Sequence, residues 1–271
     1  MKPIDAQKGL IGRKWRLFAF MLVPPLMLLM GLITNPPRES NEIQKQNGVV
    51  DVDALIKKVK TLNQEKKHQK AIDLLTTALD QENPDSLLKP LLLQTFDLFL
   101  ENEIRAGEQE IKANTKNIKA YLKTASALEL LDSRYKALEL LVAGISINPE
   151  AHELWMKIGK LEHKSERNFE AFDVYKEVIR LDPENSDAYN NAAFVLAKAP
   201  KTRPKDLENA LTLIIRARKL DPENPEYLDT MAEIVFRQGN PAEAQNLIKE
   251  AIKKAPSKDI FKAQLKRFSQ Q

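Results

Sequence analysis

A proline-terminated stretch with helical periodicity, FEAFDVYKEVIRLDP, occupies residues 169–183. Its apolar residues recur at the spacing of an amphipathic helix, and the proline ends the helix because it lacks an amide donor and restricts the residue before it. Comparable stops occur at Pro149, Pro183, Pro222 and Pro256, with successive spacings of 34, 39 and 34. These spacings predict a helical unit of roughly 34 residues that repeats along the chain.

Small residues test this repeat when units are counted from Ile118, His152, Ser186 and Pro225. Where helices of one unit meet, and where one unit meets the next, backbones approach too closely for a large side chain. At unit positions 8, 20 and 27, eleven of the twelve residues are Ala or Gly, although these types make up only 35 of the 271 residues. The twelve are Ala125, Ala137, Gly144, Gly159, Ala171, Val178, Ala193, Ala210, Ala217, Ala232, Ala244 and Ala251.

With these small residues and its period, the chain resembles the tetratricopeptide repeat (TPR) family over residues 52–257. Large residues also match the family, at position 4 (Tyr121, Trp155, Tyr189) and at position 24 (Leu141, Tyr175, Ile214). The resemblance implies an all-α fold, a solenoid of about six helix-turn-helix units. We place the units at residues 52–85, 86–117 (degenerate), 118–151, 152–185, 186–224 and 225–257.

Two further features belong to this array. The longest of the three proline spacings contains five extra residues around Lys198–Lys205. We expect them to form an exposed basic loop that two prolines stiffen. This loop is either a tolerated surface insertion or a contact with a partner. Residues 258–271 are expected to form a capping helix and tail, with Ser257 as N-cap, because a solenoid must cover the apolar face of its final repeat.

The N-terminal part of the chain predicts a membrane anchor. A basic tail, residues 1–16, precedes the uncharged run Leu17–Ile33, which at roughly 1.5 Å per residue is just long enough to cross a bilayer. The basic tail should stay cytoplasmic, which places the solenoid outside the cytoplasm, in the periplasm of a bacterium. A signal peptide cleaved to release a periplasmic protein is the alternative, and residues 34–51 are a polar linker.

The charge distribution argues against nucleic-acid binding. The chain has 42 basic and 38 acidic residues, but its N-terminal tail holds five of the basic side chains against Asp5 alone. The body is therefore neutral, with no excess positive charge to displace counterions from a nucleic acid.

Catalytic and metal-binding motifs are also missing from the sequence. With no Cys, the chain has neither a thiol nucleophile nor a thiolate ligand. His152-Glu153 opens like a zinc-protease motif, but Met156 replaces the second histidine. We therefore expect no enzyme activity, no metal, no cofactor and no small-molecule substrate.

Recognition of a protein or peptide is the remaining function. The resemblance to TPR proteins implies a concave groove lined by the first helix of each unit, and one large apolar residue per unit there serves either binding or packing between repeats. The last two units add carboxylates, which predict either a partner with a basic segment at that end or an acidic face that is simply solvated. The predicted groove residues are Lys119, Leu122, Ser126, Glu129, Glu153, Met156, Lys160, His163, Asp187, Asn190, Phe194, Glu226, Asp229, Glu233 and Phe236.

These expectations combine into a single-pass membrane protein whose TPR domain acts as a scaffold or adaptor in assembling an envelope complex. The alternative is a non-catalytic chaperone subunit for cytochrome c maturation or for another envelope enzyme. The oligomeric state is left open by both.

Overall fold

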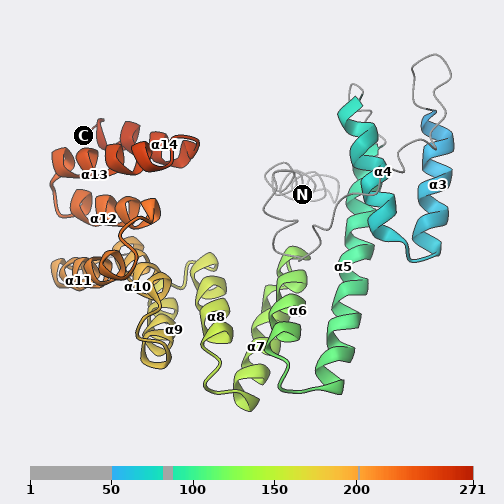
Figure 1. Ribbon diagram of the computed structural model, residues 1–271, viewed down its shortest axis with the longest axis horizontal. Coiled ribbons are helices and arrows are strands. Elements are labelled where there is room, and N and C mark those ends of the chain that lie inside the picture. The colour runs from blue at the N-terminus through green and yellow to red at the C-terminus, as the bar shows by residue number, and fades with distance from the viewer. Residues whose placement is uncertain (1–50, 82–87, 201, 271) are drawn as a thin grey trace, which may run out of the picture. The chain divides into compact units, whose positions relative to one another are not determined.

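A computed structural model describes residues 51–81, 88–200 and 202–270, and the regular elements in these ranges are all α-helices (Figure 1). The expected all-α, TPR-like solenoid is confirmed. The predicted tail, membrane span and linker lie outside the described residues. Within the described ranges, none of the helices combines the length and apolarity that crossing a bilayer requires.

The chain divides into two compact units, Met1–Glu101 and Asn102–Gln271. In the first unit, α3 (Val52–Gln64) and α4 (His68–Gln81) form an antiparallel pair, followed by the N-terminal half of α5 (Leu88–Ala113). Asp51 caps α3, because its side chain accepts a hydrogen bond of 3.0 Å from the amide of Ala54. Leu55, Ala71 and Leu75 are among the buried residues that hold this pair together.

Within residues 86–117, the unit called degenerate from its sequence, the structure has one continuous helix, α5, of 26 residues. The physical reason lies in the sequence after Pro90, which is tolerated in the first helical turn. From residue 91 to residue 113 no proline interrupts the chain. The one glycine, Gly107, lies so close to Thr124 of α6 that a Cβ on it would be 1.9 Å from the Thr124 Oγ1.

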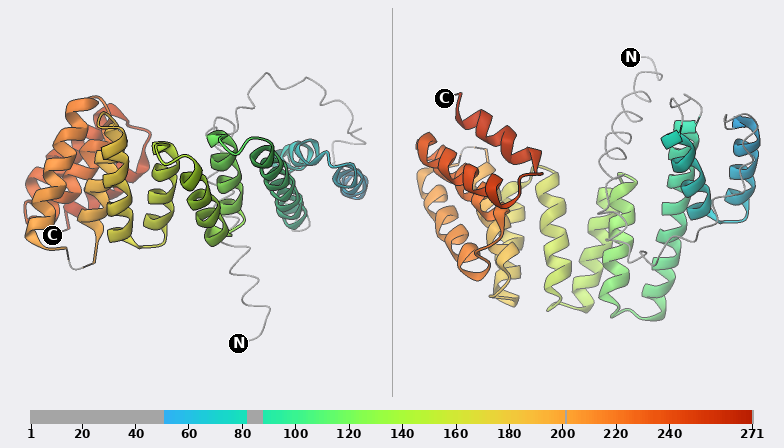
Figure 2. Two further views of the ribbon diagram at one scale, coloured as in Figure 1. Left: turned by 90° about the horizontal axis from the view of Figure 1, so that it is seen from below. Right: turned by 45° about the horizontal axis from the view of Figure 1, so that its top comes forward.

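The second unit contains four helix pairs and a final helix, stacked in chain order (Figure 2). Helices one after another in the chain make most of the contacts, and the first helices of neighbouring pairs also touch, as α10 and α12 do. The pairs are α6 (Ile118–Leu130) with α7 (Arg134–Ile147), α8 (His152–Lys164) with α9 (Asn168–Leu181), α10 (Ser186–Lys198) with α11 (Pro204–Leu220), and α12 (Pro225–Arg237) with α13 (Pro241–Lys254); α14 is Asp259–Phe268.

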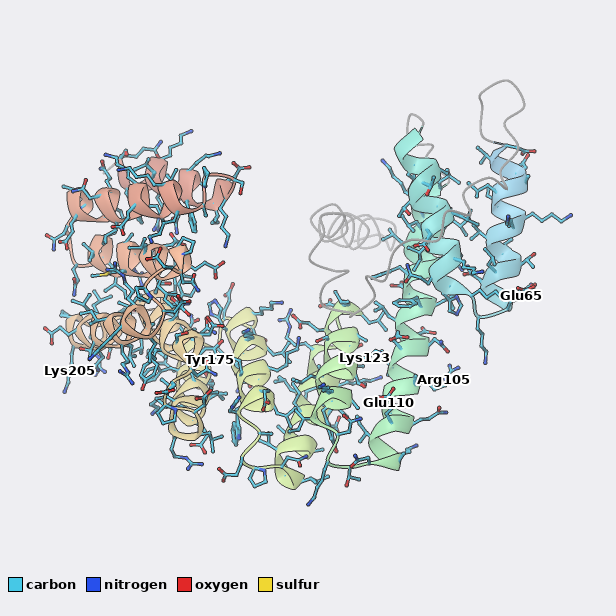
Figure 3. All side chains as sticks on the ribbon, viewed as in Figure 1. Glu65, Arg105, Glu110, Lys123, Tyr175 and Lys205 are labelled. Atoms are coloured by element: carbon cyan, nitrogen blue, oxygen red, sulfur yellow. The ribbon has the colours of Figure 1, made fainter. Side chains whose placement is uncertain are left out.

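All twelve small-residue positions are buried, which explains the regular Ala and Gly pattern. Gly159 on α8 shows the constraint most clearly, because a Cβ there would lie 2.5 Å from the ring of Tyr175 on α9, labelled in Figure 3. At Gly144, a Cβ would lie 3.0 Å from Tyr121 and from Leu154. The large residues at positions 4 and 24 therefore fill the space that the small residues leave.

The turns inside the regular helix pairs repeat one backbone geometry. Lys66, Asp132, Glu166 and Gly239 have φ of 58°, 58°, 61° and 89°, and they stand at the same place in their units. In each turn the next residue donates a backbone hydrogen bond to the carbonyl five residues earlier, at 2.8 to 3.1 Å. This is the Schellman ending of a helix, in which glycine is the least strained residue.

The insertion in the α10–α11 pair is only partly a loop. α11 has 17 residues where α7, α9 and α13 have 14, so three of the five extra residues lengthen this helix. The reason is a strong helix start: Pro204 lies in the first turn, and Asp206 accepts a hydrogen bond of 3.1 Å from the amide of Arg203. Ala199 is buried, so the connection is not exposed throughout.

Helix α14 packs on the last pair through Phe261 and Phe268, which are buried with Leu228 and other residues of α12 and α13. Its N-cap is Lys258 and not Ser257, and no side chain caps it there. The terminal helix thus covers apolar surface that the final repeat would otherwise expose.

Candidate functional site

The predicted groove residues lie on the first helices α6, α8, α10 and α12, and we call the surface that they form the first-helix face. Five of them are exposed: Lys119, Glu153, Lys160, Asp187 and Glu226. Glu233 is buried, with 2% of its surface exposed, and the others are half-buried. The exposed members therefore carry both charge signs, and they are the ones available to a partner without rearrangement.

The large apolar members of this face pack between repeats. Leu122 packs against the core around Tyr121 and Leu154, Met156 against the core that contains Tyr175, and Phe236 against the core under α14. Phe236 also lies 4.6 Å, centroid to centroid, from the ring of Phe268. Of the two roles left open for these residues, packing between repeats is the one that the contacts support.

On α6, Glu129 connects the first two helix pairs. It accepts a hydrogen bond of 2.7 Å from Lys157 and a second from Lys164, both on α8. Burial alone would raise the pKa of Glu129, but these two ammonium groups outweigh it and lower the pKa below its ordinary value. Glu129 is therefore a charged link between neighbouring repeats.

In the middle of the face, α8 and α10 meet through mixed contacts. His163 Nδ1 lies 2.8 Å from Asn168 Oδ1, and the imidazole meets the ring of Phe194 edge-on, with centroids 5.4 Å apart. Asn190 is less well satisfied, since its Oδ1 is buried without a hydrogen-bond donor in the described part of the chain. Ser126, at the neighbouring helix, bonds to its own backbone, at the carbonyl of Leu122.

At the C-terminal end, Glu233 lies among cations from three helices. Its carboxylate is 3.1 Å from Lys198 Nζ of α10, 4.0 Å from Arg237 Nε of its own helix, and paired with Arg267 of α14. The Arg267 guanidinium also stacks over Phe268, 4.8 Å from the ring centroid. A buried carboxylate needs such partners, so these contacts tie α10, α12 and α14 together.

Asp229, one turn before Glu233 on α12, is in a less favourable position. Burial, followed by the neighbouring charge of Glu233, raises its pKa to about 6, although Lys198 and Arg267 pull in the other direction. Its Oδ1 is buried and has no hydrogen-bond partner among the described residues. Burial therefore favours the protonated form of Asp229 up to a pH about two units higher than for an ordinary aspartate.

The two remaining acids of this end are also paired. Glu226 binds Lys258, which precedes α14, and Asp187 accepts a hydrogen bond of 2.8 Å from the hydroxyl of Tyr227. Burial is the main cause that raises the pKa of Tyr227 to about 12, so this hydroxyl keeps its proton and remains the donor to Asp187.

Two of the four carboxylates at this end, Glu226 and Glu233, thus form ion pairs with cations of the same chain. Glu226 pairs with Lys258, and Glu233 with Lys198, Arg237 and Arg267. Asp229 is influenced by the charges of Lys198 and Arg267 without forming an ion pair in the part of the chain that the structure describes, and Asp187 is bonded by the neutral hydroxyl of Tyr227. The chain therefore already balances the charge of Glu226 and Glu233, and the structure gives the predicted basic partner segment no support. The sequence could have indicated one of these cations. If the unit numbering is continued into α14, Arg267 takes position 9, which Glu233 holds in the preceding unit.

The two histidines of α8, His152 and His163, contact different residues. His152 Nδ1 lies 3.8 Å from Asp182 and its Nε2 lies 3.8 Å from Glu153, whereas His163 contacts Asn168 and Phe194. In the described ranges no three potential metal ligands gather at one place.

Two of the four basic residues of the inserted segment are paired within the chain. Arg203 pairs with Asp206 at 2.9 Å, and Lys198 pairs with Glu233. These pairings favour the interpretation of the segment as a tolerated insertion, because they leave less positive charge for a partner.

Comparison with known proteins supports a TPR-type fold for this chain. No family model matches the chain. A TPR repeat-containing protein of Pseudomonas aeruginosa, PA4667, is 30% identical over 140 residues, which are 52% of this chain and 23% of that protein. The chain therefore matches about a quarter of that relative's length.

Among solved structures, the TPR protein TTC0263 from Thermus thermophilus has a TM-score of 0.53 at 17% identity, covering 75% of this chain and 100% of that one. The structure of MamA has a TM-score of 0.49 at 19% identity, covering 66% of this chain and 99% of that one. The fold is thus a TPR-type α-solenoid, and the relative's name supports a TPR repeat protein.

Proposed function

We propose that the chain is a non-catalytic scaffold that binds a protein or peptide segment on its first-helix face. The observation that carries the proposal is the face itself: each of the four first helices holds at least one exposed charged side chain, beside half-buried apolar residues that pack between the repeats. Helical arrays of this kind provide extended binding surfaces because each repeat adds contacts of the same geometry.

The membrane tether is the second part of the proposal. The basic tail and the uncharged run Leu17–Ile33 support an anchor that holds the solenoid on the outer side of a bacterial inner membrane, where it would help to assemble an envelope complex. A fusion of reporters to the C-terminus tests this topology. Activity of a reporter that works only in the cytoplasm would refute the proposed location.

Site-specific photocrosslinking in intact membranes tests the binding face. A photoreactive residue at Lys160, on the first-helix face, is expected to capture a partner protein, whereas the same residue at Lys249, exposed on the second helix α13, is not. Equal capture at both positions, or none at Lys160, would count against a scaffold that binds through its first helices.

A further inference from the structure

The lysines of α6 and α8 are unevenly neutralised by the chain. Lys123 pairs with Glu103 of α5 at 2.6 Å, and Figure 3 labels this lysine between the two helices. Lys157 and Lys164 share the single carboxylate of Glu129. One carboxylate for two ammonium groups leaves a net positive charge at this contact.

Two further lysines on these helices have no carboxylate partner within the described residues. Lys119 on α6 and Lys160 on α8 are both exposed, and neither forms an ion pair there. The exposed Glu153 is the remaining acid of this part of the first-helix face, since Glu162 of α8 pairs with Arg167 at 3.3 Å. The five lysines of α6 and α8 therefore outnumber the carboxylates near them. Within the described residues these carboxylates are Glu103, Glu129 and Glu153, and none of them pairs with any other Lys or Arg.

Helical spacing places Lys160 in the middle of the first-helix face. It stands four residues after Met156 and four before Lys164, so all three share one side of α8. Met156 contacts Asn191 of α10 at 3.5 Å, and Lys164 contacts Glu129 of α6. Lys160 thus projects between the two neighbouring first helices and away from the buried side of α8.

The electrostatic character of the first-helix face therefore changes along the array. The portion on α6 and α8 keeps a positive excess, whereas Glu226 and Glu233 of α12 are paired with Lys258 and with cations of α10, α12 and α14. Free charge of one sign selects partners of the opposite sign and repels those of the same sign.

We propose that the α6–α8 portion of the first-helix face binds an acidic, extended or helical segment of a partner protein, with Lys119 and Lys160 pairing with its carboxylates. This inference rests on the proposed scaffold function and specifies the partner's chemistry. An acidic partner is the opposite of the basic partner that the sequence predicts. That prediction counts the acids at the C-terminal end and leaves out the cations of the same chain that pair with them.

Selection from a phage-displayed library of random dodecapeptides on the immobilised full-length chain tests the proposal. Enriched peptides are expected to be more negative than the input library. The most enriched peptide, with a fluorescent label, is then titrated by anisotropy against the parent chain, the variant K119E/K160E and the control K136E/K249E. The control reverses two exposed lysines on second helices, so both variants carry the same net charge.

The K119E/K160E variant is expected to bind about tenfold more weakly or worse, and the control within about twofold of the parent. Replacing the acidic residues of the peptide by lysine should restore binding to K119E/K160E. Enrichment of neutral or basic peptides, or equal loss in both variants, would overturn the acidic partner while leaving the scaffold function intact. Failure to enrich any peptide would count against both.

Discussion

Replacing Asp229 by Asn should remove a pH-dependent loss of stability. Asp229 has a pKa of about 6 in the folded protein against an ordinary value of 3.8, because it is buried beside Glu233. A folded-state pKa that is raised means that the folded state binds the extra proton. The stability from this group is therefore complete below about pH 4 and is lost as the pH rises through 6.

The size of the effect follows from that difference. A shift of about 2 pKa units corresponds to about 3 kcal/mol, which we reduce to about 2 kcal/mol because Asp229 remains partly accessible to solvent. Asn is neutral at every pH and nearly the same size. We expect D229N to unfold at a higher urea concentration than the parent at about pH 7.5, and the advantage to shrink to about a third near pH 4.5.

Urea titrations of both proteins between about pH 4.5 and 8 measure this difference directly. D206N gives a contrast, because hydrogen bonds from Arg203 lower the pKa of Asp206 and its contribution changes with the opposite sign. A difference between D229N and the parent that does not vary with pH would refute the reasoning, since it would mean that folding does not change the proton affinity of Asp229.

Three further sets of substitutions test the packing and the turns by chemical denaturation. Gly159→Ala should destabilise by about 1–3 kcal/mol, because the new methyl group would collide with Tyr175 at 2.5 Å; unchanged stability would mean that the ring moves freely. Glu166→Gly should stabilise by about 1 kcal/mol and Gly239→Ala should destabilise by a similar amount, since both residues have positive φ; effects of the same sign would contradict the shared turn geometry. Glu233→Ala should cost about 3 kcal/mol, because it leaves the cations around it unpaired, and the near-UV circular dichroism of Phe236 and its neighbours should change with it; a loss below about 1 kcal/mol would mean that the contact is not a link between repeats.

The repeat could be predicted from the sequence because its physical cause is local. Alanines and glycines mark where backbones touch, and prolines mark where helices end, so the twelve small positions identified the α6–α13 pairs without tertiary information. The continuous α5 was missed because a degenerate unit and a long helix differ mainly in whether a turn is present. Neither proline nor glycine stands between residues 91 and 106.

The turns were only partly predictable. Gly239 has the residue type that positive φ favours, but Lys66, Asp132 and Glu166 adopt the same geometry without it. Packing of each helix pair determines these turns, and the strain at a non-glycine residue is small enough for the rest of the unit to offset.

By itself, the sequence determined the all-α class, the period and the residues that form the first-helix face, since all three depend on spacing along one chain. Tertiary structure decided which charges on that face remain free. Glu233 and Arg267 are 34 residues apart, and Glu129 and Lys164 are 35 apart, so their pairing depends on how neighbouring repeats stack. Charge neutralisation acts over a few ångströms in space, and for that reason only the folded protein shows that Glu226 and Glu233, two acids counted along the chain, are already paired.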